Sequence, residues 1–386
     1  MERAELEAVV RETGCAEESG GFWFLCDPQW REAERRQVDQ LRAAARASTS
    51  PPDSARGWLC IATGGTSGEV RFARHDEQTM TAAVAGFCDF FKLDQVNAGD
   101  VLPGYHVSGL MSRVRCAASG GHHMPCDWRR LEAGERPMLS ARDGSWVISL
   151  VPTQLQRLMV SPGATDWLRS FKVIFVGGGP TWPDLTRAAA ELGLPIALTY
   201  GMTETAAMVA AIAPDDFRNG ERVRATPLQH AKITVGSEGA IVIEGRSVFH
   251  GYFPHSRETQ VFETEDLGRI DERGRLQIFG RKDAVIITGG KKVQPQEVEA
   301  ALQATGQFVD VAVIGVPDPE WGESVVACFP KPETAEPNWT TVERALERSL
   351  AAYKRPKRFV AITDWPRNAQ GKLSRTELAQ RVARAN

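Results

Sequence analysis

The hydrophobic pattern between residues 58 and 200 alternates between short apolar runs and longer amphipathic segments. The run Phe171–Val176 is apolar except at Lys172 and predicts a buried strand, and the amphipathic segment Trp182–Leu192 predicts a helix. This alternation favours a layered α/β domain with mostly parallel strands. Similar patterns predict further strands at Trp58–Ile61, Ser145–Leu150 and Pro195–Thr199, and further helices at Thr79–Phe91 and from Pro152 onward.

The pattern changes after about residue 225. Apolar and polar residues alternate in three segments, which predicts antiparallel strands at Lys232–Val235, Gly239–Glu244 and Gly274–Phe279. From Ala284 short strands and helices follow one another, as in a small α+β domain. We therefore predict an α/β protein with two domains. Residues 1–282 form a large N-terminal domain of layered mixed sheets and helices with a β-rich subdomain, and residues 283–386 form a small α+β domain.

The first fifty residues are polar and predict helical structure. The basic stretch from Arg31 to Arg46 fits a solvated helix face better than an arm that binds nucleic acid. The segment Ser48–Asp53, which reads STSPPD, predicts a linker.

Composition and charge restrict the classes of partner. A formal net charge of −3 over 386 residues gives no field that would recruit nucleic acid. The acidic N-terminus does not resemble a signal peptide, and no apolar run has the length of a membrane span. The seven cysteines include no C-x-x-C pair, which favours a cytoplasmic location. His122 and His123 lie near Cys116 and Cys126, but their spacing matches no standard zinc pattern.

The segment Ile61–Gly68, which reads IATGGTSG, has the composition of a loop that wraps phosphates. Its glycines allow backbone N–H groups to approach an anion, and its hydroxyl groups add donors. It lacks the Gly-Lys-Ser/Thr ending of a Walker A loop, because Glu69-Val70-Arg71 follows. A bare connection with the same composition is the alternative.

Two further glycine-containing segments follow predicted strands. Gly177–Pro180 and Tyr200–Thr205 each occupy the position where an α/β sheet binds ligands, outside the carboxyl end of a strand. Within the second segment, Tyr200 could stack on a base, Thr203 could donate to a phosphate, and Glu204 could hold Mg²⁺. Each segment alone could be an ordinary turn, but two successive strand ends of this kind are a much more specific signal of a ligand site than either alone.

Three charged residues complete the candidate chemistry. The Asp266 carboxylate could accept both hydroxyls of a ribose, and Arg281 could add a donor; a surface ion pair is the alternative. Lys372 follows a glycine near the C-terminus, where its ammonium group could neutralise a phosphate. A solvated turn is the alternative reading of that lysine.

The order of these motifs resembles the adenylate-forming superfamily of acyl-CoA synthetases, firefly luciferase and adenylation domains. The resemblance extends from about residue 58 to residue 380. It rests on seven segments, which are TGGTSGEVR (63–71), LPGYHVSGL (102–110), VGGGP (176–180), YGMTET (200–205), ETEDLG (263–268), GRKDAVIITGGKKVQPQEVE (280–299) and PRNAQGKLSR (366–375).

The resemblance implies a reaction in two steps that uses ATP, Mg²⁺ and coenzyme A. A carboxylate attacks the α-phosphorus of ATP to give an acyl-adenylate, and the CoA thiol then displaces AMP. The implied catalytic residues are Lys372, Thr203, Glu204 and His106, with Glu204 as the Mg²⁺ ligand. The resemblance also implies that the C-terminal domain, which carries Lys372, is mobile and turns about Asp283 as its hinge. The implied nucleotide and CoA residues are Thr63, Gly64, Gly65, Thr66, Ser67, Gly68, Arg71, Gly177, Gly178, Gly179, Pro180, Tyr200, Gly201, Met202, Asp266, Arg281, Gly289 and Gly290.

Within the superfamily the chain most resembles o-succinylbenzoate–CoA ligases of menaquinone synthesis. The resemblance lies in the segment SLVPTQL (149–155) and in Arg115, which follows the His-x-Ser-Gly element. It implies an acid pocket lined by His106, Ser108, Gly201 and Arg115, whose guanidinium would hold the unreactive carboxylate of a dicarboxylic acid. Arg71 stands where lysine is usual, Glu69 adds negative charge, and the N-terminal region is short.

Three alternatives stay open from the sequence. The chain could ligate another aromatic or aliphatic acid, transfer the acyl group to a carrier protein, or be an inactive nucleotide-binding homologue. Retention of Glu204, Asp266, Arg281 and Lys372 argues against the inactive form. The expected partners are small molecules, with a homodimer as a further expectation.

Overall fold

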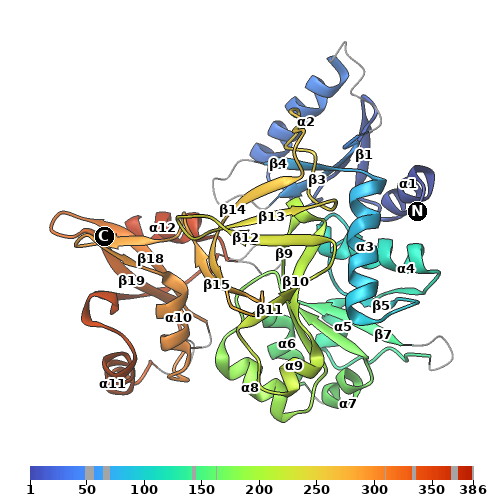
Figure 1. The fold of residues 1–386 in the computed structure, drawn as a ribbon. Coiled ribbons are helices and arrows are strands. Elements are labelled where there is room, and N and C mark those ends of the chain that lie inside the picture. The colour runs from blue at the N-terminus through green and yellow to red at the C-terminus, as the bar shows by residue number, and fades with distance from the viewer. Residues whose placement is uncertain are drawn as a thin grey trace.

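The computed structural model describes residues 1–47, 56–63, 70–140, 145–161, 163–308, 310–332, 336–366 and 373–384. Within these ranges the strands form three sheets, and helices pack on their faces (Figure 1). A large N-terminal part and a smaller C-terminal part are evident, which confirms the predicted fold class. The predicted linker Ser48–Asp53 lies outside the described residues.

The N-terminal segment contains a β-hairpin, so the prediction of helical structure is wrong for residues 16–25. Gly20 and Gly21 connect the two strands, and their φ values of 59° and 81° suit the two-residue turn of a hairpin. The hairpin buries Phe22 and Phe24, which a polar helix would have exposed. Its elements and the flanking helices are α1 (Arg3–Glu12), β1 (Ala16–Ser19), β2 (Phe22–Leu25) and α2 (Glu32–Ala47).

The first sheet has four strands in the order β1-β2-β3-β4. Strands β3 (Leu59–Thr63) and β4 (Arg71–His75) are antiparallel, and Thr63 pairs directly with Arg71. The two ends of the predicted phosphate loop are therefore cross-strand neighbours. The segment between them, residues 64–69, lies outside the described residues.

Half of the second sheet consists of parallel strands, as the apolar runs predict. Strand β8 (Val173–Val176) is buried at all four positions because its side chains face two different cores. Ile174 and Val176 pack toward one core, whereas Val173 and Phe175 pack against Phe87 on the other face. The parallel strands are β5 (Asn97–Asp100), β6 (His123–Pro125), β7 (Trp146–Leu150), β8 (Val173–Val176) and β9 (Ile196–Met202). The helices are α3 (Glu77–Phe91), α4 (Val107–Ser119), α5 (Trp128–Glu132), α6 (Pro152–Met159), α7 (Ala164–Arg169) and α8 (Pro183–Glu191).

The pairing becomes antiparallel at β9 and β10, and it stays antiparallel through the rest of the sheet. This half confirms the β-rich region predicted after residue 225. Its elements are η2 (Thr203–Thr205), β10 (Ala207–Ile212), α9 (Pro214–Arg218), β11 (Arg224–Pro227), β12 (Ala231–Val235), β13 (Ala240–Gly245), β14 (Val261–Ile270) and β15 (Leu276–Arg281).

The C-terminal part has its own sheet, which is orange to red in Figure 1, and two cores of its own. Strand β20 pairs in parallel with β19, and the other pairs are antiparallel. The boundary between residues 282 and 283 stays a prediction. The elements are β16 (Ile286–Thr288), β17 (Lys291–Val293), α10 (Pro295–Gln303), β18 (Ala312–Asp318), β19 (Gly322–Pro330), α11 (Trp339–Ser349), η3 (Ala352–Lys354), β20 (Arg358–Ile362) and α12 (Arg375–Arg384).

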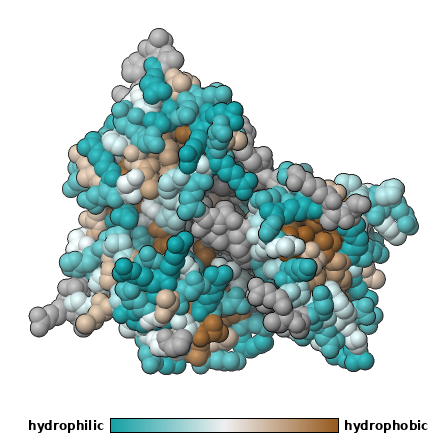
Figure 2. Space-filling view, turned by 180° about the vertical axis from the view of Figure 1, so that it is seen from behind, coloured by the Kyte–Doolittle hydropathy of each residue, from teal (hydrophilic) through white to brown (hydrophobic). Residues whose placement is uncertain are grey.

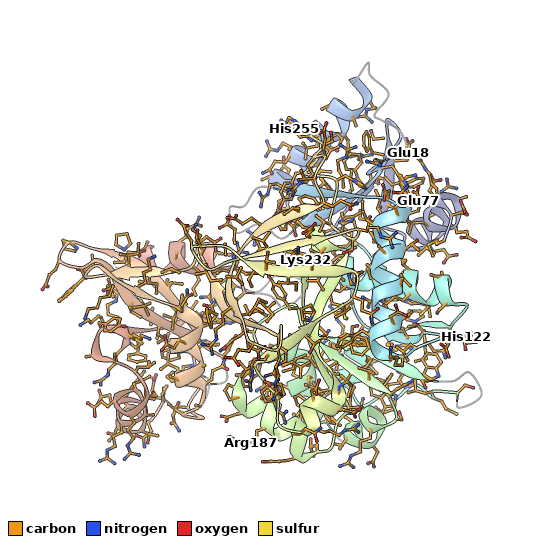
Figure 3. The ribbon with its side chains drawn as sticks, in the orientation of Figure 1. Glu18, Glu77, His122, Arg187, Lys232 and His255 are labelled. Atoms are coloured by element: carbon orange, nitrogen blue, oxygen red, sulfur yellow. The ribbon has the colours of Figure 1, made fainter. Side chains whose placement is uncertain are left out.

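The surface is largely polar. Figure 2 shows mostly hydrophilic residues on the rear face, with an apolar area on the C-terminal part. Glu18, His122 and Arg187 are exposed and lie at the periphery of the ribbon (Figure 3). Arg74 and Arg115 differ from these residues because both are buried. None of the described helices has the length and apolar character needed to cross a membrane.

Candidate active site

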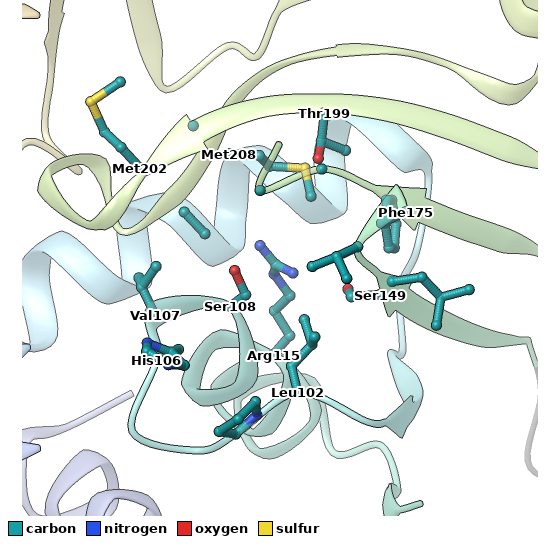
Figure 4. A pocket seen from close by; sticks show the side chains of 17 residues that line it. Leu102, His106, Val107, Ser108, Arg115, Ser149, Phe175, Thr199, Met202 and Met208 are labelled. Carbon is teal, nitrogen blue, oxygen red and sulfur yellow. The ribbon is translucent and has the colours of Figure 1, made fainter. Parts of the chain in front are cut away.

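A pocket with a volume of about 140 Å³ opens at the carboxyl ends of β7, β8 and β9 (Figure 4). Here the sheet changes from parallel to antiparallel pairing, and ligands in α/β proteins bind outside the carboxyl ends of parallel strands. The lining includes all four residues predicted for the acid pocket. It consists of Leu102, Pro103, His106, Val107, Ser108, Arg115, Ser149, Leu150, Val151, Phe175, Gly177, Gly178, Thr199, Gly201, Met202, Ala207 and Met208.

Helix α4 brings three predicted residues to this pocket. His106 is the N-cap residue of α4, and its ring lies 4.5 Å from the Tyr105 ring between centroids. Ser108 and Arg115 are seven residues apart, which places them on one face of the helix two turns apart. A Cβ atom on Gly109 would lie 2.3 Å from the Pro103 carbonyl oxygen, so only glycine allows this close approach of α4 to the pocket loop.

The Arg115 side chain extends from α4 into the centre of the pocket (Figure 4). Arg115 is only 4% exposed, and its guanidinium carbon lies 4.0 Å from the centre of the Phe87 ring. Burial lowers the pKa of Arg115 to about 10, so the side chain stays charged at neutral pH. Among the described residues no carboxylate pairs with this guanidinium. A buried cation without an anionic partner is unfavourable, so the pocket suits an anionic ligand.

Glycines let the backbone close around the pocket. A Cβ atom on Gly177 would lie 2.2 Å from Thr199 Oγ1, and one on Gly201 would lie 2.0 Å from the Ala207 carbonyl oxygen. Both positions therefore require glycine, because a side chain at either one would clash with the neighbouring strand. Gly178 also lines the pocket, whereas Gly179 and Pro180 are exposed and do not line it. Their predicted part in nucleotide binding stays a prediction.

Beside the pocket, Tyr200 binds Asp266, which is one of the two residues predicted to bind ribose. The Tyr200 hydroxyl donates to Asp266 Oδ2 at 2.8 Å, and burial raises the pKa of Tyr200. Asp266 and Arg281 are cross-strand partners on β14 and β15, with 3.9 Å between Arg281 Nη1 and Asp266 Oδ1. Arg281 also donates from two nitrogens to the Asp283 carboxylate, each at 2.7 Å. The residues predicted to bind the nucleotide, Tyr200, Asp266 and Arg281, and the predicted hinge Asp283 thus form one connected group.

The turn η2 places Thr203 and Glu204 next to β3 and β4. Glu204 is 8% exposed, and its Oε1 accepts a hydrogen bond of 2.6 Å from the Tyr252 hydroxyl. Burial is the main reason that the pKa of Tyr252 is raised, and the nearby Glu204 carboxylate adds to it. The second carboxylate oxygen of Glu204 has no partner among the described residues. A buried carboxylate with one available oxygen suits a hard cation such as Mg²⁺.

The ends of the predicted phosphate loop face this same region. Thr63 Oγ1 is buried and has no hydrogen-bond partner among the described residues. The Arg71 guanidinium carbon lies 4.6 Å from the centre of the Tyr252 ring, so Arg71 is connected through Tyr252 to Glu204. The predicted loop residues Gly64, Gly65, Thr66, Ser67 and Gly68, together with Lys372, lie outside the described residues.

Other predicted residues do not line the pocket. Gly289 and Gly290, with φ values of 54° and 72°, form the two-residue turn between β16 and β17. This turn lies in the C-terminal sheet, and its predicted part in CoA binding stays a prediction. His123 Nε2 lies 2.9 Å from Asp100 Oδ2, and the described residues include no cluster that could hold a metal ion.

Sequence reasoning missed two residues that contact η2. Tyr252 binds Glu204, and His75 Nε2 lies 2.7 Å from the Thr203 carbonyl oxygen. Burial lowers the pKa of His75 to about 4. Both contacts join segments that are far apart in the chain, so no local pattern in the sequence could have indicated them.

Comparisons with known proteins relate this geometry to a family. The model of the AMP-binding enzyme family matches residues 7–253, and that of the AMP-binding enzyme C-terminal domain matches residues 297–372. A 2-succinylbenzoate–CoA ligase of Geobacillus kaustophilus is 31% identical over 297 residues, which are 73% of this chain and 60% of the relative. The chain therefore spans less than two thirds of that relative's length.

Two solved structures are similar over most of the chain. The o-succinylbenzoate coenzyme A synthetase (MenE) of Bacillus subtilis, in complex with ATP and a magnesium ion, has a TM-score of 0.70 and 25% identity. The match covers 84% of this chain and 70% of that chain. ATP-bound MatB from Rhodopseudomonas palustris has a TM-score of 0.73 and 26% identity, and the match covers 91% of this chain and 78% of that chain. Together with the family models, these similarities show that the chain belongs to the AMP-binding enzyme family.

Proposed function

We propose that the protein is an ATP-dependent acid–CoA ligase that acts through an acyl-adenylate. The proposed acid is o-succinylbenzoate, and the product is o-succinylbenzoyl-CoA for menaquinone or phylloquinone biosynthesis. Family membership supports the reaction type, and the similarity to 2-succinylbenzoate–CoA ligases supports the acid.

The observation that carries this proposal is the buried Arg115 guanidinium in the pocket. o-Succinylbenzoate has two carboxylates, of which one must react and the other must be held. A guanidinium forms two parallel hydrogen bonds with a carboxylate, which fixes the orientation of the acid as well as its position. His106, Ser108 and Gly201 line the same pocket and would contact the rest of the acid.

On the nucleotide side, the hydroxyls of Thr63 and Thr203 and the amides of residues 64–68 would donate to the phosphates. Tyr200, Gly177 and Gly178 would border the adenine, and Asp266 with Arg281 would bind the ribose. Glu204 would hold Mg²⁺, which neutralises phosphate charge when it is bound. Lys372 would add a positive charge during attack of the carboxylate on the α-phosphorus.

The second half-reaction requires coenzyme A and a different arrangement of the C-terminal part. We propose that residues 283–386 turn about Asp283, which removes Lys372 from the site and brings Gly289 and Gly290 toward the thiol. Gating motions of this kind separate successive steps on one enzyme. The seven free cysteines support a cytoplasmic location, and a homodimer stays a prediction that light scattering would test.

The proposal is tested by pyrophosphate release from ATP with a panel of acids. We expect o-succinylbenzoate to exceed benzoate and medium-chain fatty acids in kcat/KM by at least about 100-fold, because only this acid satisfies the buried cation. Equal or higher rates with a monocarboxylic acid would assign the chain to another acid. No release with any acid would favour an inactive nucleotide-binding homologue.

A further inference from the structure

His75 is the last residue of β4 and lies far from the pocket in sequence, but it contacts the η2 turn directly. Its side chain is fully buried, and its Nε2 lies 2.7 Å from the carbonyl oxygen of Thr203. A carbonyl oxygen can only accept, so the ring must carry its hydrogen on Nε2 and donate from there. This bond ties strand β4 to the turn that carries Thr203 and Glu204.

The other ring nitrogen of His75 is held by the first turn of α3. Nδ1 lies 3.1 Å from Thr79 Oγ1, whose single hydroxyl hydrogen can point to Nδ1 or to the Asp76 carbonyl oxygen, 2.9 Å away. Thr79 is in turn fixed by Asp76, the N-cap residue of α3, whose carboxylate accepts from the Thr79 backbone N–H at 3.0 Å. The imidazole therefore has a polar neighbour at each ring nitrogen, and the 2.7 Å contact with Thr203 is the shorter of the two.

The backbone is strained just after the residue that His75 contacts. Ala206 and Ala207 follow η2 with φ values of 51° and 81°, which L-residues other than glycine rarely adopt. Strained backbone persists where surrounding contacts determine its conformation, and it is concentrated at functional sites. The Thr203 carbonyl oxygen accepts from the Ala206 backbone N–H at 3.2 Å as well as from His75, so His75 and the strained residue Ala206 bind the same carbonyl oxygen.

We propose that His75 is a positioning residue for adenylation, which holds η2 so that the Thr203 hydroxyl and the Glu204 carboxylate face the phosphates and Mg²⁺. The inference rests on the proposed function, because it assigns a purpose to the orientation of those two groups. His75 itself is not among the residues that line the pocket. It acts through the Thr203 carbonyl group, at the back of the turn.

Two substitutions separate this purpose from a general loss of packing. The amide nitrogen of glutamine can reach about as far as Nε2, whereas that of asparagine matches only Nδ1. His75→Gln therefore keeps the donor to Thr203 and His75→Asn loses it. His123→Gln is a matched control, because it alters the histidine contact with Asp100, which lies away from η2.

ATP–pyrophosphate exchange with o-succinylbenzoate, measured over a range of Mg²⁺ and ATP concentrations, provides the readout. For His75→Asn we expect a rate roughly 10- to 100-fold lower, since small displacements of catalytic groups have effects of this size. The Mg²⁺ concentration for half-maximal rate should rise several-fold, with the KM for the acid changed less than about twofold. His75→Gln should recover most of the rate, and His123→Gln should keep the wild-type Mg²⁺ dependence.

The inference is overturned if the asparagine and glutamine variants behave alike, or if a folded asparagine variant keeps the wild-type Mg²⁺ dependence. Nitrogen-15 NMR of histidine-labelled wild-type protein decides the matter if the asparagine variant does not fold. An Nε2–H tautomer of His75 whose signal shifts on addition of Mg²⁺-ATP supports the inference, and an Nδ1–H tautomer contradicts it. Wild-type protein without exchange for any acid contradicts the proposed function instead, and the inference falls with it.

Discussion

The Tyr252 hydroxyl donates a hydrogen bond of 2.6 Å to Glu204 Oε1, across 48 positions of the chain. This bond occupies one oxygen of the buried carboxylate, and the other has no partner among the described residues. Because Arg71 lies against the Tyr252 ring, the same tyrosine also connects Glu204 to the end of the phosphate loop.

We predict that Tyr252→Phe weakens metal use without abolishing nucleotide binding. The variant loses one hydrogen bond to a charged group, which contributes about 1.5–3 kcal/mol. The Mg²⁺ concentration for half-maximal pyrophosphate release should therefore rise by about 10-fold or more. Tyr353→Phe, on η3 of the C-terminal part, is the control and should keep the wild-type value. An unchanged Mg²⁺ dependence in Tyr252→Phe would show that the bond does not orient Glu204.

Arg115 gives a prediction about the acid alone. Arg115→Ala removes the buried cation, so kcat/KM for o-succinylbenzoate should fall by about 100-fold or more while the KM for ATP changes little. Arg115→Lys keeps the charge but loses the two-pronged geometry, and we expect an intermediate loss. Steady-state pyrophosphate release at varied acid and varied ATP measures both effects. Equal changes in the two KM values would contradict a specific interaction with the acid.

The two half-reactions should respond in opposite ways to changes at Lys372 and at the hinge. Lys372→Ala should abolish formation of the acyl-adenylate but largely spare thioester formation from supplied acyl-adenylate. Asp283→Pro should slow thioester formation more than adenylation, because proline restricts the backbone at the proposed hinge. Quenched-flow assays of each half-reaction measure these rates. Equal loss of both half-reactions in the lysine variant would remove its assignment to the first step.

The strands and motifs were predictable where a local pattern determines them. Strand β8 was found because both of its faces are buried, which leaves a nearly continuous apolar run. Arg115 was found from the resemblance, but its burial required the structure. The hairpin at Gly20 and Gly21 was missed because it is short and lies between two polar helices, although the paired glycines were a usable signal. Tyr252 was missed because its partner is distant in sequence.

His230, a half-buried residue whose two ring nitrogens are buried, makes protein stability depend on pH. Burial lowers the pKa of His230 to about 4, and the positive charge of Arg115 lowers it further. The unfolded chain therefore binds the proton first as the pH falls. The contribution to stability is complete above about pH 6.5 and is lost toward pH 4, with a slope of at most about 1.4 kcal/mol per pH unit. The free energy of unfolding, measured with urea from pH 4.5 to 8, should change less steeply with pH in His230→Leu than in the wild type. An identical pH dependence in the two proteins would contradict the prediction.

The most direct test of the proposed reaction is identification of its products. Purified protein is incubated with o-succinylbenzoate, ATP, Mg²⁺ and coenzyme A, and all nucleotides and thioesters are quantified by mass spectrometry. We predict o-succinylbenzoyl-CoA and AMP in equal amounts, with acyl-adenylate accumulating when coenzyme A is omitted. Absence of both AMP and thioester above the background without protein would contradict the assignment of this chain as an acid–CoA ligase.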